Sequence, residues 1–296
     1  RFLEMNGCAR VEGFDPRQSG LALNRWIVGS TARAVANVTA ALDDYKFNEA
    51  ANAAYDFVWG TFCDWYLELA KPVLTGEDAE AKAETQATAG FALDQILKLL
   101  HPFMPFVTEE LWAETGKAGP ARANLLIISD WPDLAGLEDA EAQSELDWLV
   151  SLISGIRSVR QEMNVPAGAK IKLLVIGAGE ETGVRVEANL NALTRLARLE
   201  SVDYTSDAPR DSAQLILGEA TFVLPLAGVI DLDAERGRLK RDIAKEQSDI
   251  DKIDKKLGNE QFVAKAPEDV IEEQRPRRAE AEDRVKRLLE ALSRLS

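Results

Sequence analysis

The sequence predicts a mainly α-helical protein: an antiparallel helical bundle, then a small α/β unit, then a two-helix antiparallel coiled-coil hairpin. Apolar residues recur at helical spacing through about the first 115 positions. Short β-branched runs cluster between about residues 166 and 230, and apolar residues then return at heptad spacing. The length of 296 residues suits about two or three domains. We predict domains at 1–133, 134–230 and 231–296.

The composition excludes several classes of protein. A hydrophobic content of 46% excludes a wholly disordered chain. No apolar run approaches the roughly 20 residues that a membrane-spanning helix needs. The 35 basic and 50 acidic residues give a net charge of −15, which argues against a general nucleic-acid binder, normally a basic protein. The start at Arg1, with no initiator Met or apolar signal segment, suggests a fragment of a longer protein.

The residue types that usually carry catalysis or bind metals are scarce. Cys8 and Cys63 lie far apart without a CxxC motif, so we interpret them as reduced core residues, with a disulfide as the alternative. The single histidine, His101, follows an apolar helix end and precedes two prolines, which suits a packed or capping residue. No phosphate-binding glycine loop occurs. We therefore expect no catalytic residue, no metal site and no cofactor in this chain.

Two long helices open the predicted bundle. Asn24 is a suitable N-cap for the first, whose apolar positions continue to Leu42. The second carries apolar residues at helical spacing over residues 47–69, and we expect Pro72 to end it. Faces of matching length predict that the two helices pack antiparallel.

Two further helices complete the bundle. A polar stretch leads into a third helix, whose apolar positions lie within residues 91–100. Pro105 can open a fourth, short helix at its first turn. We expect Val107, Leu111 and Trp112 to point inward from it.

The middle of the chain changes pattern. An amphipathic helix over residues 146–159 precedes a β-branched strand at 170–176. A further helix is expected over 186–199. Three more short strands are predicted at 202–205, 213–217 and 220–224.

The last 66 residues carry two heptad-spaced runs separated by a turn near Gly258 and Pro267. Each run is long enough for a helix of roughly 35–45 Å. The matched lengths favour an antiparallel hairpin within one chain, closed into a coiled coil. An intermolecular coiled coil is the alternative.

The charge of this hairpin differs from that of the rest. Residues 231–296 hold 16 basic and 17 acidic side chains, a net of −1, which leaves −14 for the first 230 residues. Ordinary pairing between coiled-coil helices accounts for part of this content. Several basic residues nevertheless gather around the turn: Lys252, Lys255, Lys256, Lys265, Arg275, Arg277 and Arg278. Because salt screens each charge beyond about 10 Å, such a tip can contact phosphate even on an acidic protein.

Several segments resemble a known family. Residues 100–112 (LHPFMPFVTEELW) resemble the anticodon-binding helical domains of the class I aminoacyl-tRNA synthetases for Val, Ile, Leu and Met. Residues 24–27 (NRWI) and 62–68 (FCDWYLE) are similar to valyl-tRNA synthetases. So are residues 156–166 (IRSVRQEMNVP), while 257–267 (LGNEQFVAKAP) resemble the turn of the valyl C-terminal arm. The resemblance covers essentially the whole chain in the same order.

The resemblance implies what the parent protein does. Valyl-tRNA synthetases attach valine to tRNA(Val) with ATP, edit misacylated threonine, and carry HIGH-type and KMSKS-type motifs. Neither motif is in this sequence, so the catalytic and editing domains are expected to be missing. The implied partners are tRNA(Val) and those domains of the same chain. ATP belongs to the catalytic domain, and we expect a cytoplasmic monomer without membrane contact.

The resemblance also suggests binding residues. Arg1, Phe2, Asp64, Trp65, Tyr66 and Glu68 are expected near the anticodon. The seven basic residues around the hairpin turn are expected at the tRNA elbow. The competing interpretation is a non-enzymatic helical scaffold whose coiled coil binds a protein.

Overall fold

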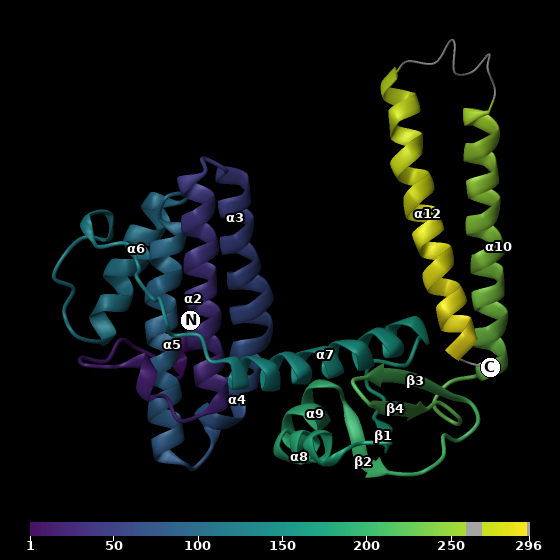
Figure 1. Cartoon of the computed structure of the whole chain (residues 1–296), viewed down its shortest axis with the longest axis horizontal. Helices are drawn as coiled ribbons and strands as arrows, with labels where there is room; N and C mark the ends of the chain where they lie inside the picture. Colours follow the sequence, from purple (N-terminus) through teal and green to yellow (C-terminus); the bar gives the residue numbers. More distant parts are fainter. Residues whose placement is uncertain (259–267, 295–296) are drawn as a thin grey trace. The chain divides into compact units, whose positions relative to one another are not determined.

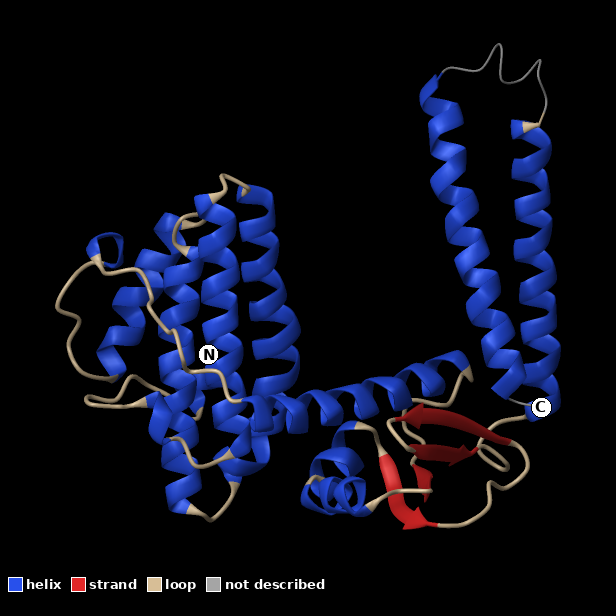
Figure 2. Cartoon of the chain, viewed as in Figure 1, coloured by secondary structure: helices blue, strands red, loops and turns tan. Residues whose placement is uncertain are grey.

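The computed structural model describes residues 1–258 and 268–294, and the chain divides into two compact units, Arg1–Val150 and Ser151–Ser296. Helices dominate both units, and the described strands form one small sheet in the second (Figures 1 and 2). The predicted fold class, mainly helical with a small α/β unit and C-terminal helices, is confirmed. The domain boundaries after residues 133 and 230 stay a prediction.

The first unit is a helical bundle. Its elements are α1 Phe2–Met5, η1 Pro16–Gln18, α2 Ala22–Asp43, α3 Phe47–Tyr55, η2 Asp56–Tyr66, α4 Leu67–Thr75, α5 Ala79–Leu100, α6 Pro105–Thr115, η3 Gly116–Ala118 and η4 Leu126–Ile128. Helix α2 packs against both α3 and α5, and its side chains Ile27 and Val38 are fully buried. Helix α7, Ala140–Glu162, begins in this unit and ends in the second.

The first long helix starts earlier than its sequence suggests. Helix α2 begins at Ala22, so Asn24 is not its N-cap. The Glu84 carboxylate of α5 instead accepts from the backbone amides of Gly20 and Leu21, both at 3.0 Å. The amide groups just before α2 thus find their acceptor on α5, which is distant in sequence but packs against α2. Asn24 is fully buried, and its amide donates to Glu84 at 2.8 Å.

The second long helix is continuous from α3 through η2 to α4. Its middle, η2, is π-helical, which sequence periodicity does not reveal. Pro72 lies inside α4, and the helix ends three residues later at Thr75, so the prediction that Pro72 ends it is wrong. A proline near a helix end removes one backbone hydrogen bond, and here the last turn continues beyond it.

The prediction for the fourth helix is confirmed for Trp112 and wrong for Val107 and Leu111. In α6, Thr108 and Trp112 are buried, whereas Val107 is 50% and Leu111 45% exposed. Thr108 and Trp112 are four residues apart and share a face. Val107 and Leu111 precede them by one residue each and therefore lie about 100° around the helix.

The α/β part of the second unit is built on a four-stranded sheet of order β2-β1-β4-β3. Its elements are β1 Ile171–Ile176, α8 Glu180–Ala188, α9 Leu190–Leu196, β2 Leu199–Tyr204, β3 Ser212–Leu217 and β4 Ala220–Pro225. Strands β1 and β2 run parallel through the helical crossover, and the other pairs are antiparallel. The predicted helix 186–199 is two helices divided at Asn189, and Leu199 opens β2 instead.

The C-terminal arm consists of α10 Leu232–Leu257 and α12 Glu268–Arg294, which pack against each other within the chain. Ile250 on α10 is buried against Ala281 and Val285 on α12. At 1.5 Å per residue, the 26 and 27 residues give helices of about 40 Å. The two helices of the predicted hairpin are therefore present, and they pack against each other within one chain.

Candidate nucleic-acid interface

Two segments predicted to approach an RNA meet at the start of the chain. The Lys71 ammonium of α4 lies 5.8 Å from the centroid of the Phe2 ring and also pairs with the Glu68 carboxylate. Phe2 and Glu68, 66 positions apart, are thus joined by one lysine that the sequence did not single out. Arg1 precedes α1 and is exposed.

The other predicted residues lie in the π-helical segment η2. Asp64 is exposed, and Trp65 is partly buried. Tyr66 is fully buried and stacks on Phe62 with ring centroids 5.5 Å apart. The Tyr66 hydroxyl donates to Asn24 Oδ1 at 3.2 Å, so this residue supports the bundle from within. A base-reading role for Asp64, Trp65 and Glu68 stays a prediction.

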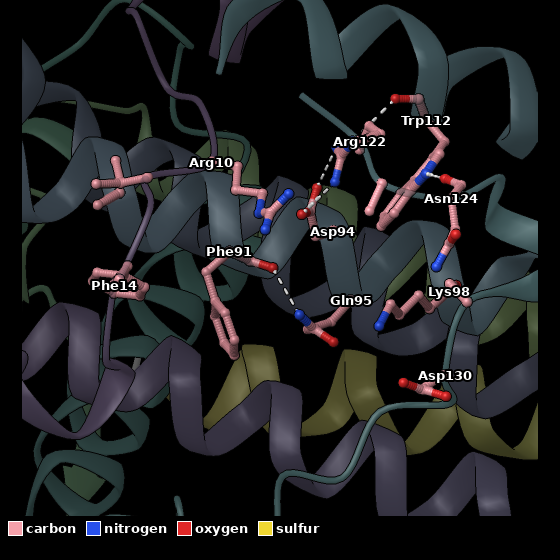
Figure 3. Close-up of a pocket in the computed structure, with 15 residues that line it drawn as sticks. Arg10, Phe14, Phe91, Asp94, Gln95, Lys98, Trp112, Arg122, Asn124 and Asp130 are labelled. Atoms are coloured by element: carbon pink, nitrogen blue, oxygen red, sulfur yellow. Dashed lines mark hydrogen bonds and ion pairs between the residues drawn. The ribbon is translucent and has the colours of Figure 1, made fainter. Parts of the chain in front are cut away.

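The bundle also contains a pocket of about 390 Å³ that sequence reasoning missed (Figure 3). It combines aromatic rings with cations from four separate segments. The residues that matter chemically are Arg10, Phe14, Phe91, Lys98, Trp112 and Arg122. Phe14 and Phe91 form a tilted pair with centroids 5.9 Å apart. Since these segments are far apart in the chain, no local motif could reveal the pocket.

A buried ion pair forms one wall of this pocket. Both terminal nitrogens of Arg122 donate to the Asp94 carboxylate at 2.7 Å. The Arg122 guanidinium also lies 3.6 Å from the centroid of the Trp112 ring. Trp112 in turn donates from its indole to the Asn124 carbonyl at 3.1 Å. Arg122 is therefore committed to the structure of the bundle.

Two other cations of the pocket are available to a ligand. Within the described part of the chain, neither Arg10 nor Lys98 forms an ion pair. Burial lowers the pKa of the Lys98 ammonium, while Asp94 and Asp130 partly oppose that shift. Figure 3 shows the Arg10 and Lys98 side chains pointing toward the interior of the pocket. A planar base beside the phenylalanines and a phosphate near these cations would suit this arrangement.

The segment that carries Arg10 is fixed by close backbone packing. A Cβ atom added at Gly90 of α5 would lie 2.3 Å from the Ala9 carbonyl oxygen. One added at Gly119 would lie 2.7 Å from the Arg10 carbonyl oxygen. Glycine at both positions lets the segment lie directly against the helix and against the following loop.

The basic residues of the arm fall into two groups. Lys252 pairs with Asp249 at 2.6 Å, and Arg278 pairs with Asp254 of the opposite helix at 2.6 Å. Lys255, Lys256 and Arg275 are exposed, and among the residues that the structure describes they form no ion pair. Arg277 also has an interaction partner, so it does not belong with these three residues. Lys265 lies outside the described residues.

The histidine and the two cysteines, the residue types most often used in catalysis or metal binding, have structural surroundings. His101 caps the C-terminus of α5, with its Nδ1 2.8 Å from Thr108 Oγ1. Cys8 and Cys63 are free thiols, and burial raises the pKa of Cys8 to about 11. The described ranges contain no group of three metal-ligating side chains. They also contain no helix long and apolar enough to cross a membrane.

Comparison with known proteins places both parts of the chain. Residues 24–175 match the family model described as the anticodon-binding domain of tRNA ligase. Residues 231–296 match the valyl tRNA synthetase tRNA binding arm. The chain is 54% identical over its whole length to a valine–tRNA ligase of Caulobacter vibrioides and 48% to one of Brucella suis. It spans 33% and 32% of the lengths of these relatives.

Proposed function

Because the chain belongs to the family of tRNA-ligase anticodon-binding domains and carries the valyl-type arm, we propose that it binds tRNA(Val). Two separate surfaces make the contact. The bundle binds the anticodon loop, and the arm contacts the tRNA elbow. The observation that carries the proposal is the presence of unpaired cations on both matched parts of a chain whose net charge is −15.

The bundle supplies the specific part of the interaction. Single-stranded loops are read by stacking splayed bases on aromatic rings and by hydrogen bonds to base edges. The pocket of Arg10, Phe14, Phe91 and Lys98 offers both kinds of contact. Phe2, held by Lys71, adds an aromatic group from the predicted segment. Anticodon discrimination is therefore assigned to this unit.

The arm supplies the part that is independent of base sequence. Lys255 and Lys256 are exposed near the end of α10, and Arg275 is exposed in the first part of α12. Each phosphate that such a side chain neutralises releases counterions, so affinity falls as salt rises. Lys252 and Arg278 contribute less, because their own carboxylate partners already neutralise them.

The chemistry belongs to the parent protein. We propose that it joins valine to tRNA, as the name valine–tRNA ligase of its relatives indicates, with tRNA(Val) as the substrate and ATP as the source of energy. The motifs of the catalytic domain are outside this sequence, and this chain contributes substrate binding as a monomer. The two free cysteines support a reducing, cytoplasmic location.

The test of the bundle is a binding assay on the 296-residue chain at low salt. We compare a tRNA(Val) transcript, a non-cognate tRNA, and tRNA(Val) carrying the non-cognate anticodon. Tighter binding of tRNA(Val), lost on anticodon exchange, supports anticodon binding. Equal affinity for all three would remove that role. No binding to any tRNA would favour the protein-interaction scaffold.

The test of the arm uses charge reversal. The double variant Lys255→Glu with Lys256→Glu is expected to bind tRNA(Val) and the non-cognate tRNA at least tenfold more weakly. The slope of log affinity against log salt concentration should fall by about 2. Lys240→Glu, on an exposed position of the same helix far from the turn, is the matched control. Unchanged affinity of the double variant would overturn the elbow contact.

A further inference from the structure

The α/β part of the second unit contains a hollow of about 390 Å³ that no motif predicted. Three arginines line it: Arg157 and Arg160 from the end of α7, and Arg198 from the turn between α9 and β2. The other described lining residues carry no charge. In a chain with a net charge of −15, this gathering of one sign needs an explanation.

Arg160 is the buried member of this arginine hollow, with 8% of its surface exposed. Its guanidinium donates to the carbonyl oxygens of Ala169 at 2.8 Å and Pro166 at 3.4 Å. Carbonyl oxygens satisfy donors without cancelling the charge. Burial and the neighbouring Arg198 both lower the pKa of Arg160, so a bound anion would relieve a real electrostatic cost.

Arg198 is held in an unusual backbone conformation. Its φ of 55° lies in the left-handed region, where glycine and asparagine are favoured over arginine. One terminal nitrogen donates to the Ala167 carbonyl, which leaves other donors of its five N–H groups for a ligand. The side chain is exposed, and among described residues Arg198 and Arg160 form no ion pair. A large cation kept at a strained position points to a role for its charge.

The surrounding sequence shares this bias. Residues 157–172 contain four basic side chains, Arg157, Arg160, Lys170 and Lys172, against the single acid Glu162. The hollow therefore sits in a locally positive stretch, which attracts anions despite the net charge of the chain. Arg157 is anchored as well, since its Nε donates to the Leu196 carbonyl at 3.0 Å.

We propose that the arginine hollow binds a phosphate of the tRNA backbone, as a contact separate from the anticodon pocket and the arm. The inference rests on the proposed tRNA binding. Planar guanidinium forks match phosphate oxygens and bind them in pairs, and carbonyl-anchored arginines are already oriented to do so. RNA is favoured over an acidic polypeptide because Arg157 and Arg160 lie within residues 24–175, which match the anticodon-binding domain, and Arg198 precedes the matched arm at residues 231–296.

The test removes the charge of Arg198 without disturbing the fold. Asparagine tolerates the left-handed backbone, so Arg198→Asn keeps the turn and deletes the cation. Arg198→Lys keeps a charge without the fork, and Arg210→Gln is a control of equal charge change at an exposed residue outside the hollow. Each variant is titrated with tRNA(Val) and a non-cognate tRNA over a range of salt, after circular dichroism confirms native melting.

The expected result is distinct from every effect on the anticodon pocket. Arg198→Asn weakens both tRNAs alike, about tenfold, and lowers the salt slope by about 1, because phosphate contacts carry no sequence information. Arg198→Lys loses less, and Arg210→Gln changes neither quantity.

Three results overturn the proposal. The first is wild-type affinity and salt slope for Arg198→Asn. The second is an equal loss for Arg210→Gln. The third is a loss of polyglutamate binding, but not of RNA binding, in Arg198→Asn, which would assign an acidic polypeptide as the ligand. A wild-type chain that binds no tRNA at all would instead refute the proposed function.

Discussion

The bundle and the arm hold their charges in opposite ways. In the bundle, Arg122 and Asp94 have side chains only 10% and 12% exposed, and they are tied into a network with Trp112. In the arm, Arg284 pairs with Glu246 across the two helices while 46% of its side chain stays exposed. Buried charges of the first kind fix a structure. Exposed charges of the second kind remain available to a polyanion.

The difference follows from the size of the core around each pair. The bundle surrounds Arg122 and Asp94 with several helices, so these two charged groups have to find partners inside the protein. In the described part of the arm, the two helices bury a small cluster of Ile250, Ala281 and Val285 between them, and most of the α10 surface faces water. Affinity for RNA can therefore be altered in the arm at low cost in stability, whereas in the bundle the two are coupled.

The largest predicted effect removes one side of the buried pair. Arg122→Ala leaves Asp94 as an uncompensated buried charge and is expected to lower the free energy of unfolding by about 3–5 kcal/mol. Urea unfolding followed by circular dichroism measures it. Replacing both residues, Asp94→Leu with Arg122→Met, should recover most of the loss. A single variant as stable as wild type would contradict the distinction between the two regions.

A smaller effect is expected where the chain packs directly on α5. Gly90→Ala places a methyl group against the backbone of Ala9 and should cost about 1–3 kcal/mol. Gly60→Ala is the matched control, because nothing lies within 4 Å of the added atom in η2. Thermal melting of the two variants measures the difference. Equal melting temperatures would show that the Cys8–Arg10 segment is free to move.

The sequence predicted the elements far better than the contacts between them. Helical and heptad periodicity revealed the bundle and both arm helices, since each period reports one buried face. Periodicity could not reveal that Glu84 would hold the start of α2, because that bond joins residues over 60 positions apart. It also could not separate Val107 from Trp112 on a short helix that carries apolar residues on several sides.

The candidate site was predictable in the same uneven way. Basic residues near the hairpin turn are visible in the sequence, but which of them have partners depends on α10 and α12 lying side by side. Arg278 illustrates this, since Asp254 reaches it from 24 positions away. The pocket around Lys98 and the arginine hollow around Arg198 assemble cations from separate segments, and no linear pattern contains that information.

A third prediction compares stability at different pH values. Tyr66→Phe removes the hydroxyl that donates to Asn24 and should cost about 1 kcal/mol at pH 7. Burial raises the pKa of Tyr66 well above 10, with smaller contributions from Cys8 and Glu84. The folded state therefore keeps its proton while the unfolded state begins to lose it near pH 10. Wild type should lose stability as pH rises above about 10, and Tyr66→Phe should lose less over the same range. Parallel pH profiles would contradict this.

The smallest effect belongs to the arm. The Arg284–Glu246 pair joins α12 to α10 at 3.0 Å, but water screens the guanidinium. A double-mutant cycle with Arg284→Ala and Glu246→Ala should give a coupling energy of about 0.2–1 kcal/mol, decreasing as salt is raised to 1 M. The same variants measured for tRNA affinity separate the two uses of the charge. Arg284→Ala should weaken tRNA binding only if phosphate competes with Glu246 for the guanidinium, whereas Glu246→Ala should then strengthen it. A coupling energy above about 3 kcal/mol would mean that the Arg284–Glu246 pair stabilises the arm as strongly as a buried ion pair stabilises the bundle.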